Sequence, residues 1–458
     1  LSLVGSEMCI RDSTTIVATA ILLAGWQLFA VIANQPELIP SLPRLVRTLC
    51  EWLVSGSFYQ SVGATILRGV LGMSISFVCA IGMAGLFARF EWVYELFRPL
   101  LAIMRSIPVI SFILLALIFL NPESIPLMIA FLTMFPLLTE NLTRGILDLR
   151  PGLSIMARQF HIRRSNVLFQ IIYPQLKPFL YSGLASAAGF GWRAIIMGEV
   201  LSQCAFGIGS EMKRAQNFIA VPELLAWTIV AVFISFFFDK GISKVADITP
   251  KISFANEDQT IPTPTLSVLD TKDISYQYGI QHFSHSFQKG IIYGISAPSG
   301  KGKTTLLNLI GGILLPTEGE IHPTRHFGIA TIFQQPQLLP HLTAEENIIL
   351  PLSSFLTEEK ARRIAQKHLQ EMEMEPFGNR YPKELSYGQQ QRIAIARALA
   401  YPSPLLLMDE PFKGLDEALS HRIIERIREK QMKEERIILF TSHNPDEIRL
   451  LADEVIYL

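Results

Sequence analysis

The run from Ala297 to Thr305 has the composition of a phosphate-binding turn. It reads Ala-Pro-Ser-Gly-Lys-Gly-Lys-Thr-Thr, follows the β-rich run IIYGIS and precedes the apolar run LLNLIGGIL. A strand, a glycine-rich turn and a helix start aim backbone N–H groups at phosphates. In this pattern Lys303 neutralises the β- and γ-phosphates, and the hydroxyl of Thr304 binds Mg²⁺. Ala297 stands where the pattern has a glycine, at the point that closes the turn, so we expect nucleotide binding to survive.

Two acids end a second apolar run further along the chain. Leu405 to Met408 are followed directly by Asp409 and Glu410. A buried strand that ends in two carboxylates places one on Mg²⁺ and the other beside the attacking water. We therefore expect Asp409 to bind the metal and Glu410 to act as the general base.

Between these two motifs, residues 385–389 resemble the LSGGQ signature of ABC-transporter ATPases. They read Leu-Ser-Tyr-Gly-Gln, with Tyr387 in place of the first glycine. Further landmarks of that family lie around it in the expected order, over about 165 residues: an adenine-stacking aromatic (Tyr278, with Tyr276 as the alternative), the Q-loop (Gln334), the D-loop (Asp416) and the switch histidine (His443).

The resemblance implies an ATP hydrolase that uses Mg²⁺. Gln334 would join Thr304 and Asp409 at the metal, and Gln334 and His443 would assist Glu410. The signature of this family acts in trans, so a second copy of the chain is expected to complete each site. The residues implied in nucleotide binding are Tyr278, Pro298, Ser299, Gly300, Lys301, Gly302, Lys303, Thr304, Thr305, Ser386, Gly388, Gln389 and Asp416.

Charge is unevenly divided along the 458 residues. Residues 1–251 carry 19 Lys and Arg with 14 Asp and Glu, whereas residues 252–458 carry 21 and 26. Six long apolar stretches lie in the first part, at about 15–33, 63–88, 99–120, 124–140, 179–202 and 222–238. Stretches of this length and polarity predict membrane-spanning helices. The composition argues against a disulfide scaffold, a disordered chain and a nucleic-acid binder.

Basic residues predict how the membrane part is oriented. With the N-terminus inside, the inner segments 89–98, 141–178 and 239–251 hold eleven Lys and Arg, and the outer segments hold four. This follows the positive-inside rule. An even number of spans also returns the chain to the cytoplasm, so the nucleotide-binding part is expected on the side where ATP is.

The inner segment 141–178 resembles the cytoplasmic EAA loop of ABC importer permeases. The spacing of that loop ends at Ile171 to Pro174, and Ala157 falls on its last alanine. Ile155, Met156 and His161 replace its Glu, first Ala and Gly. We expect a short helix near 153–161 to dock onto the ATPase close to Gln334. The surrounding sequence, over about 60–240, is similar to permeases of the nitrate/sulfonate/taurine group.

Arg193 and Glu199 are ionisable residues inside an apolar stretch, where charge costs free energy and is usually functional or paired. They are six residues apart and do not share a helix face. Contact with an anionic solute along the pore, and structural pairing between helices, are both open readings at this point.

The sequence thus predicts a multi-domain protein, with an all-α bundle of about six transmembrane helices followed by an α/β P-loop ATPase domain with a helical subdomain. We expect a non-native leader (1–12), a permease domain (13–248), a linker (249–265) and an ATPase domain (266–458). The predicted function is ATP-driven import of a small anionic solute across the bacterial inner membrane by a homodimer. The expected partners are the second copy, an extracytoplasmic solute-binding protein and the lipid bilayer, with no nucleic acid.

Three alternatives stay open. An exporter usually has longer helices and a larger membrane part than the roughly 235 residues present here. A membrane-tethered P-loop regulator would need neither a signature sequence nor a loop with coupling spacing. Two adjacent genes joined in error would give the same sequence. The chain ends at Leu458, soon after His443, which leaves open a further C-terminal segment.

Overall fold

The computed structural model forms two compact units. It describes residues 2–246, 250–259, 266–277, 279–298, 300–323 and 328–458. The first unit comprises residues 1–148 and 176–248, and the second comprises 149–175 and 249–458. The second unit therefore includes a segment that lies, in sequence, between two helices of the first. The predicted boundaries at 248 and 265 stay predictions, because 247–249 and 260–265 lie outside the described residues.

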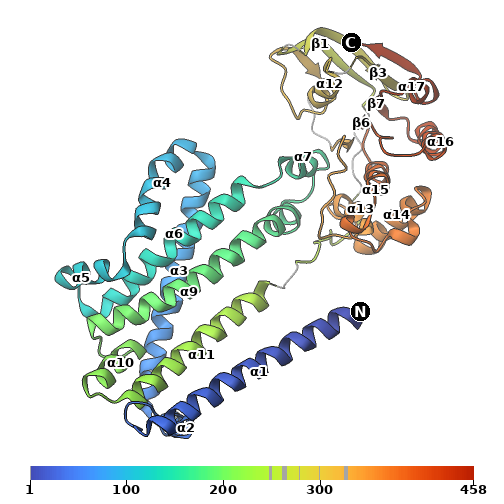
Figure 1. The fold of residues 1–458 in the computed structure, drawn as a ribbon. Helices are drawn as coiled ribbons and strands as arrows, with labels where there is room; N and C mark the ends of the chain where they lie inside the picture. Colours follow the sequence, from blue (N-terminus) through green and yellow to red (C-terminus); the bar gives the residue numbers. More distant parts are fainter. Residues whose placement is uncertain (1, 247–249, 260–265, 278, 299, 324–327) are drawn as a thin grey trace. The chain divides into compact units, whose positions relative to one another are not determined.

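The first unit is entirely helical (Figure 1). Helix α3 is 34 residues long, and α6, α9 and α11 are also long. The bounds of its elements are α1 (Ser2–Ala33), α2 (Leu42–Trp52), α3 (Gly56–Arg89), α4 (Glu91–Ser106), α5 (Val109–Phe119), η1 (Pro122–Ser124), α6 (Ile125–Leu147), α9 (Tyr173–Ser202), α10 (Ile208–Asn217) and α11 (Val221–Ala246).

Small residues let the long helices approach closely. A Cβ on Gly72 of α3 would lie 2.6 Å from the Cβ of Ala130 in α6, and one on Gly69 would lie 2.9 Å from the ring of Trp192 in α9. In lipid the hydrophobic effect does not drive helices together, so close van der Waals packing of their backbones is a main cause of helix–helix association. These contacts join α3, α6 and α9 into the core of the unit.

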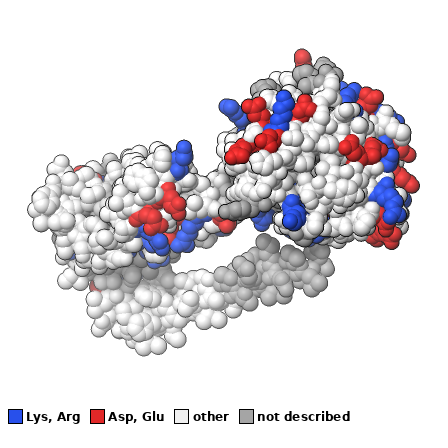
Figure 2. Space-filling model, turned by 90° about the horizontal axis from the view of Figure 1, so that it is seen from above, with Lys and Arg blue, Asp and Glu red and all other residues white. Residues whose placement is uncertain are grey.

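Within the described residues, fewer helices qualify as membrane spans than the about six expected from the sequence. Among the described residues, four helical segments are long and apolar enough to cross a membrane, namely 56–89, 122–147, 164–202 and 221–246. The stretch at 99–120 is not one straight helix, because α4 and α5 meet at 94° around Pro108, and it adds a fifth span only if the bent pair crosses together. The apolar part of α1 whose side chains are described, Val17–Ala33, is shorter. In the view of Figure 2, the surface over the helical unit is mostly uncharged.

The second unit is built on a five-stranded parallel sheet. Its strand order is β5-β6-β7-β3-β8, and a three-stranded antiparallel sheet of order β2-β1-β4 belongs to the same unit. The central strands β6 (LLLMD) and β7 (IILFT) are buried along their whole length, as expected for a parallel sheet covered on both faces. The strands are β1 (Val268–Tyr276), β2 (Ile280–Gln288), β3 (Ile292–Ser296), β4 (Glu318–His322), β5 (Ala330–Ile332), β6 (Leu405–Asp409), β7 (Ile437–Thr441) and β8 (Glu454–Tyr457).

Some helices cover this sheet, and others form a separate group beside it (Figure 1). Helix α12 (Lys303–Ile310) follows β3, while α16 (Glu417–Glu434) and α17 (Pro445–Leu451) follow β6 and β7. The separate group consists of α13 (Ala344–Leu352), α14 (Glu358–Glu371) and α15 (Tyr387–Ala400). An α/β P-loop unit with a helical subdomain after a helical membrane unit is the predicted fold class, and it is confirmed.

The loop segment 149–175 packs entirely within the second unit. It contains α7 (Pro151–Gln159), α8 (Arg164–Asn166) and a π-helix, η2 (Val167–Ile172). Leu153, Met156 and Phe160 are at most 2% exposed and belong to the same apolar core as α13 and α15. This segment therefore contributes to the hydrophobic core of the nucleotide-binding unit.

The close approach of α3 and α6 predicts a strong effect of one added methyl group. Gly72→Ala should force the helices apart and lower the free energy of unfolding by about 1–3 kcal/mol, the usual cost of overpacking. The matched control is Gly82→Ala in the same helix, where a Cβ meets nothing within 4 Å. Thermal unfolding of the purified protein in detergent measures both, and equal midpoints for the two variants would contradict the packing.

Candidate nucleotide-hydrolysis site

The phosphate-binding turn connects β3 to α12. Gly302, the N-cap of α12, has φ +88°, and a Cβ there would lie 2.7 Å from the carbonyl oxygen of Gly279, so only glycine fits. Lys303 is 7% exposed, and its ammonium donates to the carbonyl of Ala297 at 2.7 Å. The residue that departs from the usual pattern thus accepts the hydrogen bond that holds the lysine.

The predicted metal-binding residues lie together. The hydroxyl of Thr304 donates to one carboxylate oxygen of Asp409 at 2.9 Å, and the hydroxyl of Thr441 donates to the other at 2.8 Å. Burial raises the pKa of Asp409, although both hydrogen bonds act in the opposite direction. Asp409 therefore joins the ends of β6 and β7 to the start of α12.

Glu410, the candidate general base, follows Asp409 with φ +48°. Its carboxylate lies 3.1 Å from Nε2 of His443 and 3.2 Å from the ammonium of Lys413. Burial by itself raises the pKa of Glu410, but hydrogen bonds from Lys413 and Gln334 outweigh it, and the net pKa is lowered. The side chains of Gln334, Glu410 and His443, predicted from three separate motifs, converge as expected.

The donor set fits Mg²⁺ only together with phosphate. Thr304 and Asp409 supply the hard oxygen atoms that this ion prefers. Among the described residues, no group of three or more His, Cys, Asp or Glu is arranged to hold a metal. Both residues line a cavity of about 260 Å³, which Gln334 also lines. An ion there would take most of its remaining ligands from phosphate oxygens and water.

The rest of the turn is open, and two predicted residues lie outside the described part of the chain. Pro298, Gly300 and Lys301 are exposed, and Thr305 is half-buried. Ser299 and Tyr278 lie outside the described residues, so their predicted nucleotide contacts stay predictions. A Cβ built on Gly279, which follows Tyr278, would lie 3.9 Å from the Cα of Gly302.

The signature residues begin α15. Ser386 is its N-cap and forms a capping box with Gln389. A Cβ on Gly388 would lie 2.6 Å from the carbonyl oxygen of Gly414, so the signature backbone touches the D-loop of the same chain. Asp416 caps α16 by accepting from the amide of Leu419 at 2.9 Å. Within one chain, the signature residues Ser386, Gly388 and Gln389 therefore lie next to the D-loop.

The predicted docking of the short helix near Gln334 is confirmed within this unit. Helix α7 ends at Gln159, slightly earlier than expected, and Gly152 and Ile155 line the same cavity as Gln334. A Cβ on Gly152 would overlap the side-chain amide of Gln337. The side chain of Gln159 donates to the carbonyl of Gly311 at 2.8 Å, just after α12.

Sequence reasoning missed two supporting residues. Thr441 orients Asp409, and its position at the end of a buried strand before Ser442 and His443 could have indicated this role. Arg397 is 1% exposed and donates to the carbonyls of Pro336 and Gln337 at 2.8 Å each. Burial lowers its pKa to about 9, still above neutral pH, so the guanidinium keeps its charge.

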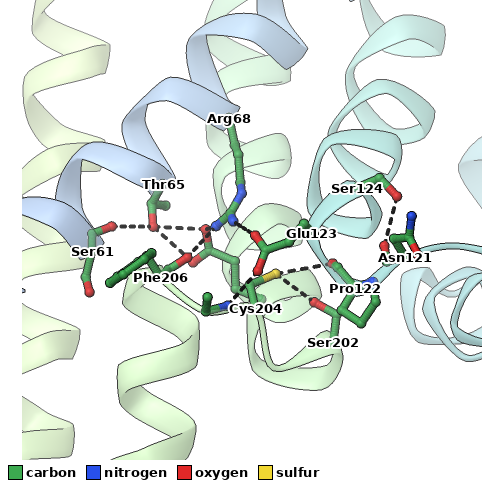
Figure 3. Close-up of polar contacts among 12 residues, drawn as sticks. Ser61, Thr65, Arg68, Asn121, Pro122, Glu123, Ser124, Ser202, Cys204 and Phe206 are labelled. Atoms are coloured by element: carbon green, nitrogen blue, oxygen red, sulfur yellow. Dashed lines mark hydrogen bonds and ion pairs between the residues drawn. The ribbon is translucent and has the colours of Figure 1, made fainter.

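In the helical unit, Glu199 belongs to an interhelical network. Figure 3 shows the side chains of Thr65, Arg68 and Glu123 in this network. Its fully buried carboxylate accepts from Arg68 at 2.7 Å, from the hydroxyl of Thr65 at 3.0 Å and from the amide of Gly209 at 2.9 Å. Arg68 also donates to Glu123 at 2.6 Å. The network links α3, η1, α9 and α10, which is the structural pairing that the sequence left open for Glu199.

Arg193 is in a different environment. Its side chain is exposed on α9, and no hydrogen bond or ion pair to it is found among the described residues. Neighbouring turns of the same face carry Ser186 and Gly189, which are half-buried. An exposed guanidinium within a long apolar helix is costly against lipid, so this face is expected to meet water or another protein surface.

Comparison with known proteins identifies both units. Residues 280–413 match the family described as ABC transporter, and residues 74–239 match the binding-protein-dependent transport system inner membrane component. The thiamine import ATP-binding protein of Yersinia pseudotuberculosis is 34% identical over 205 residues, which are 42% of this chain and 86% of that protein.

Two further relatives are similar over comparable lengths of the chain. An uncharacterized ABC transporter ATP-binding protein of Methanocaldococcus jannaschii is 34% identical over 201 residues, 40% of this chain and 85% of that protein. An Fe(3+) ions import ATP-binding protein of Rhizobium etli is 35% identical over 189 residues, 39% of this chain. The chain spans about half the length of this last relative, 54%.

The network around Glu199 predicts unequal effects of two similar substitutions. Glu199→Gln removes one partner of a buried ion pair, so the free energy of unfolding should fall by about 3–5 kcal/mol. Glu123→Gln is the matched control, because the side chain of Glu123 is 55% exposed and an exposed ion pair contributes only about 0–1 kcal/mol. Thermal unfolding in detergent would contradict the assignment if the two variants shifted the midpoint equally.

Proposed function

Because this chain belongs to the ABC transporter family, with a permease segment fused to an ATP-binding segment, we propose that it hydrolyses ATP to import a small anionic solute. The working unit is a homodimer in the bacterial inner membrane, with the ATPase on the cytoplasmic side. The observation that carries the proposal is α7. It lies in sequence between two membrane helices, and it packs inside the nucleotide-binding unit against Gln334 and Gln337.

Hydrolysis of ATP is assigned to the residues at the carboxyl ends of β6 and β7. The phosphates lie along the turn before α12, where Lys303 and the first amides of the helix face them. Thr304 and Asp409 would hold Mg²⁺, which would neutralise charge on the β- and γ-phosphates. Glu410 takes a proton from the attacking water, and His443, at 3.1 Å from Glu410, fixes the position of this carboxylate.

Coupling to the membrane unit follows from shared contacts. Gln334 lines the cavity of Thr304 and Asp409, and so do Gly152 and Ile155 of α7. A change at the γ-phosphate that moves Gln334 therefore alters the surface on which α7 rests. This contact supports a mechanical link between ATP turnover and the permease, because α7 is covalently continuous with α6 and α9.

Import, a homodimer and an anionic solute are the finer parts of the proposal. The relatives that are named for a solute are import proteins, and the permease match is to a component that works with a binding protein. One chain holds one permease segment and one ATPase segment, so sites completed in trans need two copies. The exposed Arg193 in α9 supports an anionic solute of the kind moved by nitrate/sulfonate/taurine permeases. The solute-binding protein is an external partner.

Glu410→Gln tests the hydrolytic mechanism. The variant should bind ATP like the parent, but turnover should fall by about 10²- to 10⁴-fold, the usual contribution of a positioned base. Glu425→Gln, on the exposed face of α16, is the control and should keep full activity. ATP binding and phosphate release from protein in lipid vesicles measure the two steps separately.

The lowered pKa of Glu410 also fixes the pH dependence. A base with a depressed pKa stays ionised as pH falls and loses activity only below the ordinary glutamate range. Turnover should therefore not fall through protonation of this group between about pH 8 and pH 6.

Full turnover in Glu410→Gln would overturn the assignment of Glu410 as the general base.

Arg193→Gln tests the solute pathway. The first step is co-purification with candidate external binding proteins, followed by uptake into liposomes with and without ATP. If Arg193 attracts the anion, the variant should raise the KM for uptake about tenfold and weaken discrimination against neutral analogues, since one charge-assisted contact is lost. Arg193→Lys keeps the charge and should keep most of the uptake. An unchanged KM and selectivity in Arg193→Gln would exclude this role.

A further inference from the structure

Tyr387 stands at the signature position where the family has glycine, and its side chain is held within its own chain. The hydroxyl of Tyr387 donates to the carbonyl oxygen of Gln334 at 2.8 Å. Its ring covers Gly414, where a Cβ would lie only 2.7 Å from Cδ1 of the tyrosine. Gly414 has φ +79°, so glycine is required there for the backbone as well. Signature, Q-loop and D-loop thus meet at one side chain.

The same helix holds the Q-loop at a second point. We call residues 334–337 the Gln334 segment. Arg397 lies ten residues after Tyr387 on α15, about 15 Å along the helix. It donates to the carbonyls of Pro336 and Gln337 and lies over the ring of Phe160 at 5.4 Å. The two ends of the Gln334 segment are therefore bonded to one rigid helix.

Helix α7 also contacts this segment. Gly152 lies against the side chain of Gln337, and Phe160, directly after α7, packs edge-on against Tyr401 at 5.2 Å. If the Gln334 segment shifts, its contacts can transmit the movement to α7 and to the N-terminus of α15. Without the Tyr387 hydroxyl, the contact between α15 and the Gln334 end of the segment would lose its hydrogen bond.

We infer that Tyr387 is a positioning residue that couples the two nucleotide sites of the dimer. This inference rests on the proposed function, in which Ser386 and Gly388 meet the nucleotide of the partner copy while Gln334 meets the nucleotide of its own chain. The bond from Tyr387 to Gln334 joins these two groups directly. Occupation of one site therefore biases the geometry of the other, and ATP hydrolysis is positively cooperative.

The orientation of the ring supports this role over simple obstruction. The side chain of Tyr387 is 41% exposed, and its hydroxyl end is turned to Gln334. Ser386 keeps its capping hydrogen bond with the amide of Gln389 at 3.3 Å. The tyrosine is therefore accommodated beside the N-terminus of α15 without disturbing its cap.

The test compares full-length dimers in lipid vesicles. Tyr387→Phe removes only the hydroxyl, and Tyr387→Gly removes the ring as well. Tyr457→Phe is the matched control, because Tyr457 is 79% exposed on β8, outside the hydrolysis site. For each variant, phosphate release is measured against ATP concentration, together with ATP affinity in the Glu410→Gln background and the thermal midpoint.

Tyr387→Phe should reduce kcat about fivefold, the equivalent of one hydrogen bond, and lower the Hill coefficient toward one. ATP affinity should stay at the parental value, the thermal midpoint should fall by no more than the loss of one hydrogen bond allows, and Tyr457→Phe should match the parent throughout. A parental kcat and Hill coefficient in Tyr387→Phe would overturn the inference. So would a non-cooperative parent, or a fall of affinity and stability in parallel with kcat. A parent without ATPase activity would instead overturn the proposed function itself.

Discussion

The carboxylate of Asp409 is the point on which the hydrolytic site depends. It ends β6 and accepts hydrogen bonds from Thr304, at the start of α12, and from Thr441, at the end of β7. Three segments, of which the first lies 105 residues before Asp409 and the last 32 residues after it, are thereby fixed to one group. Since Glu410 is the next residue, any displacement of Asp409 also moves the candidate base relative to the phosphate-binding turn. The parallel sheet supplies the rigidity, because its central strands are fully buried.

A second constraint joins the Gln334 segment to Phe160, the residue that follows α7. The guanidinium of Arg397 is buried without a carboxylate partner among the described residues, and two backbone carbonyls and an aromatic ring surround it. A buried charge in such a setting is stable only while every one of these contacts is kept. The Gln334 segment, Phe160 and α15 are therefore expected to move together. This provides a physical basis for transmission that needs no flexible element between the nucleotide and α7.

Local sequence was sufficient for the residues that act within one turn or strand end. Lys303, Thr304, Asp409 and Glu410 were predictable because a glycine-rich turn and an acidic strand end dictate their neighbours. The partners of Glu199 were not, since Arg68 lies 131 residues away and only helix packing brings them together. The length of the apolar stretch at 99–120 predicts one span, but Pro108 disfavours helical geometry in the residue before it and the chain turns there. The direction of the Tyr387 side chain could not be predicted from local sequence, because it depends on the contact of its ring with Gly414 in the D-loop.

The membership of residues 149–175 in the nucleotide-binding unit has a practical consequence for anyone who expresses that unit alone. An excised fragment that starts near Lys251 would lack Gln159, which contacts the carbonyl of Gly311 and the amide of Ile329. It would also lack Phe160, one of the aromatic residues that pack against the ring of Tyr401. Such a fragment should aggregate readily, and a synthetic peptide spanning the missing helix should restore its solubility.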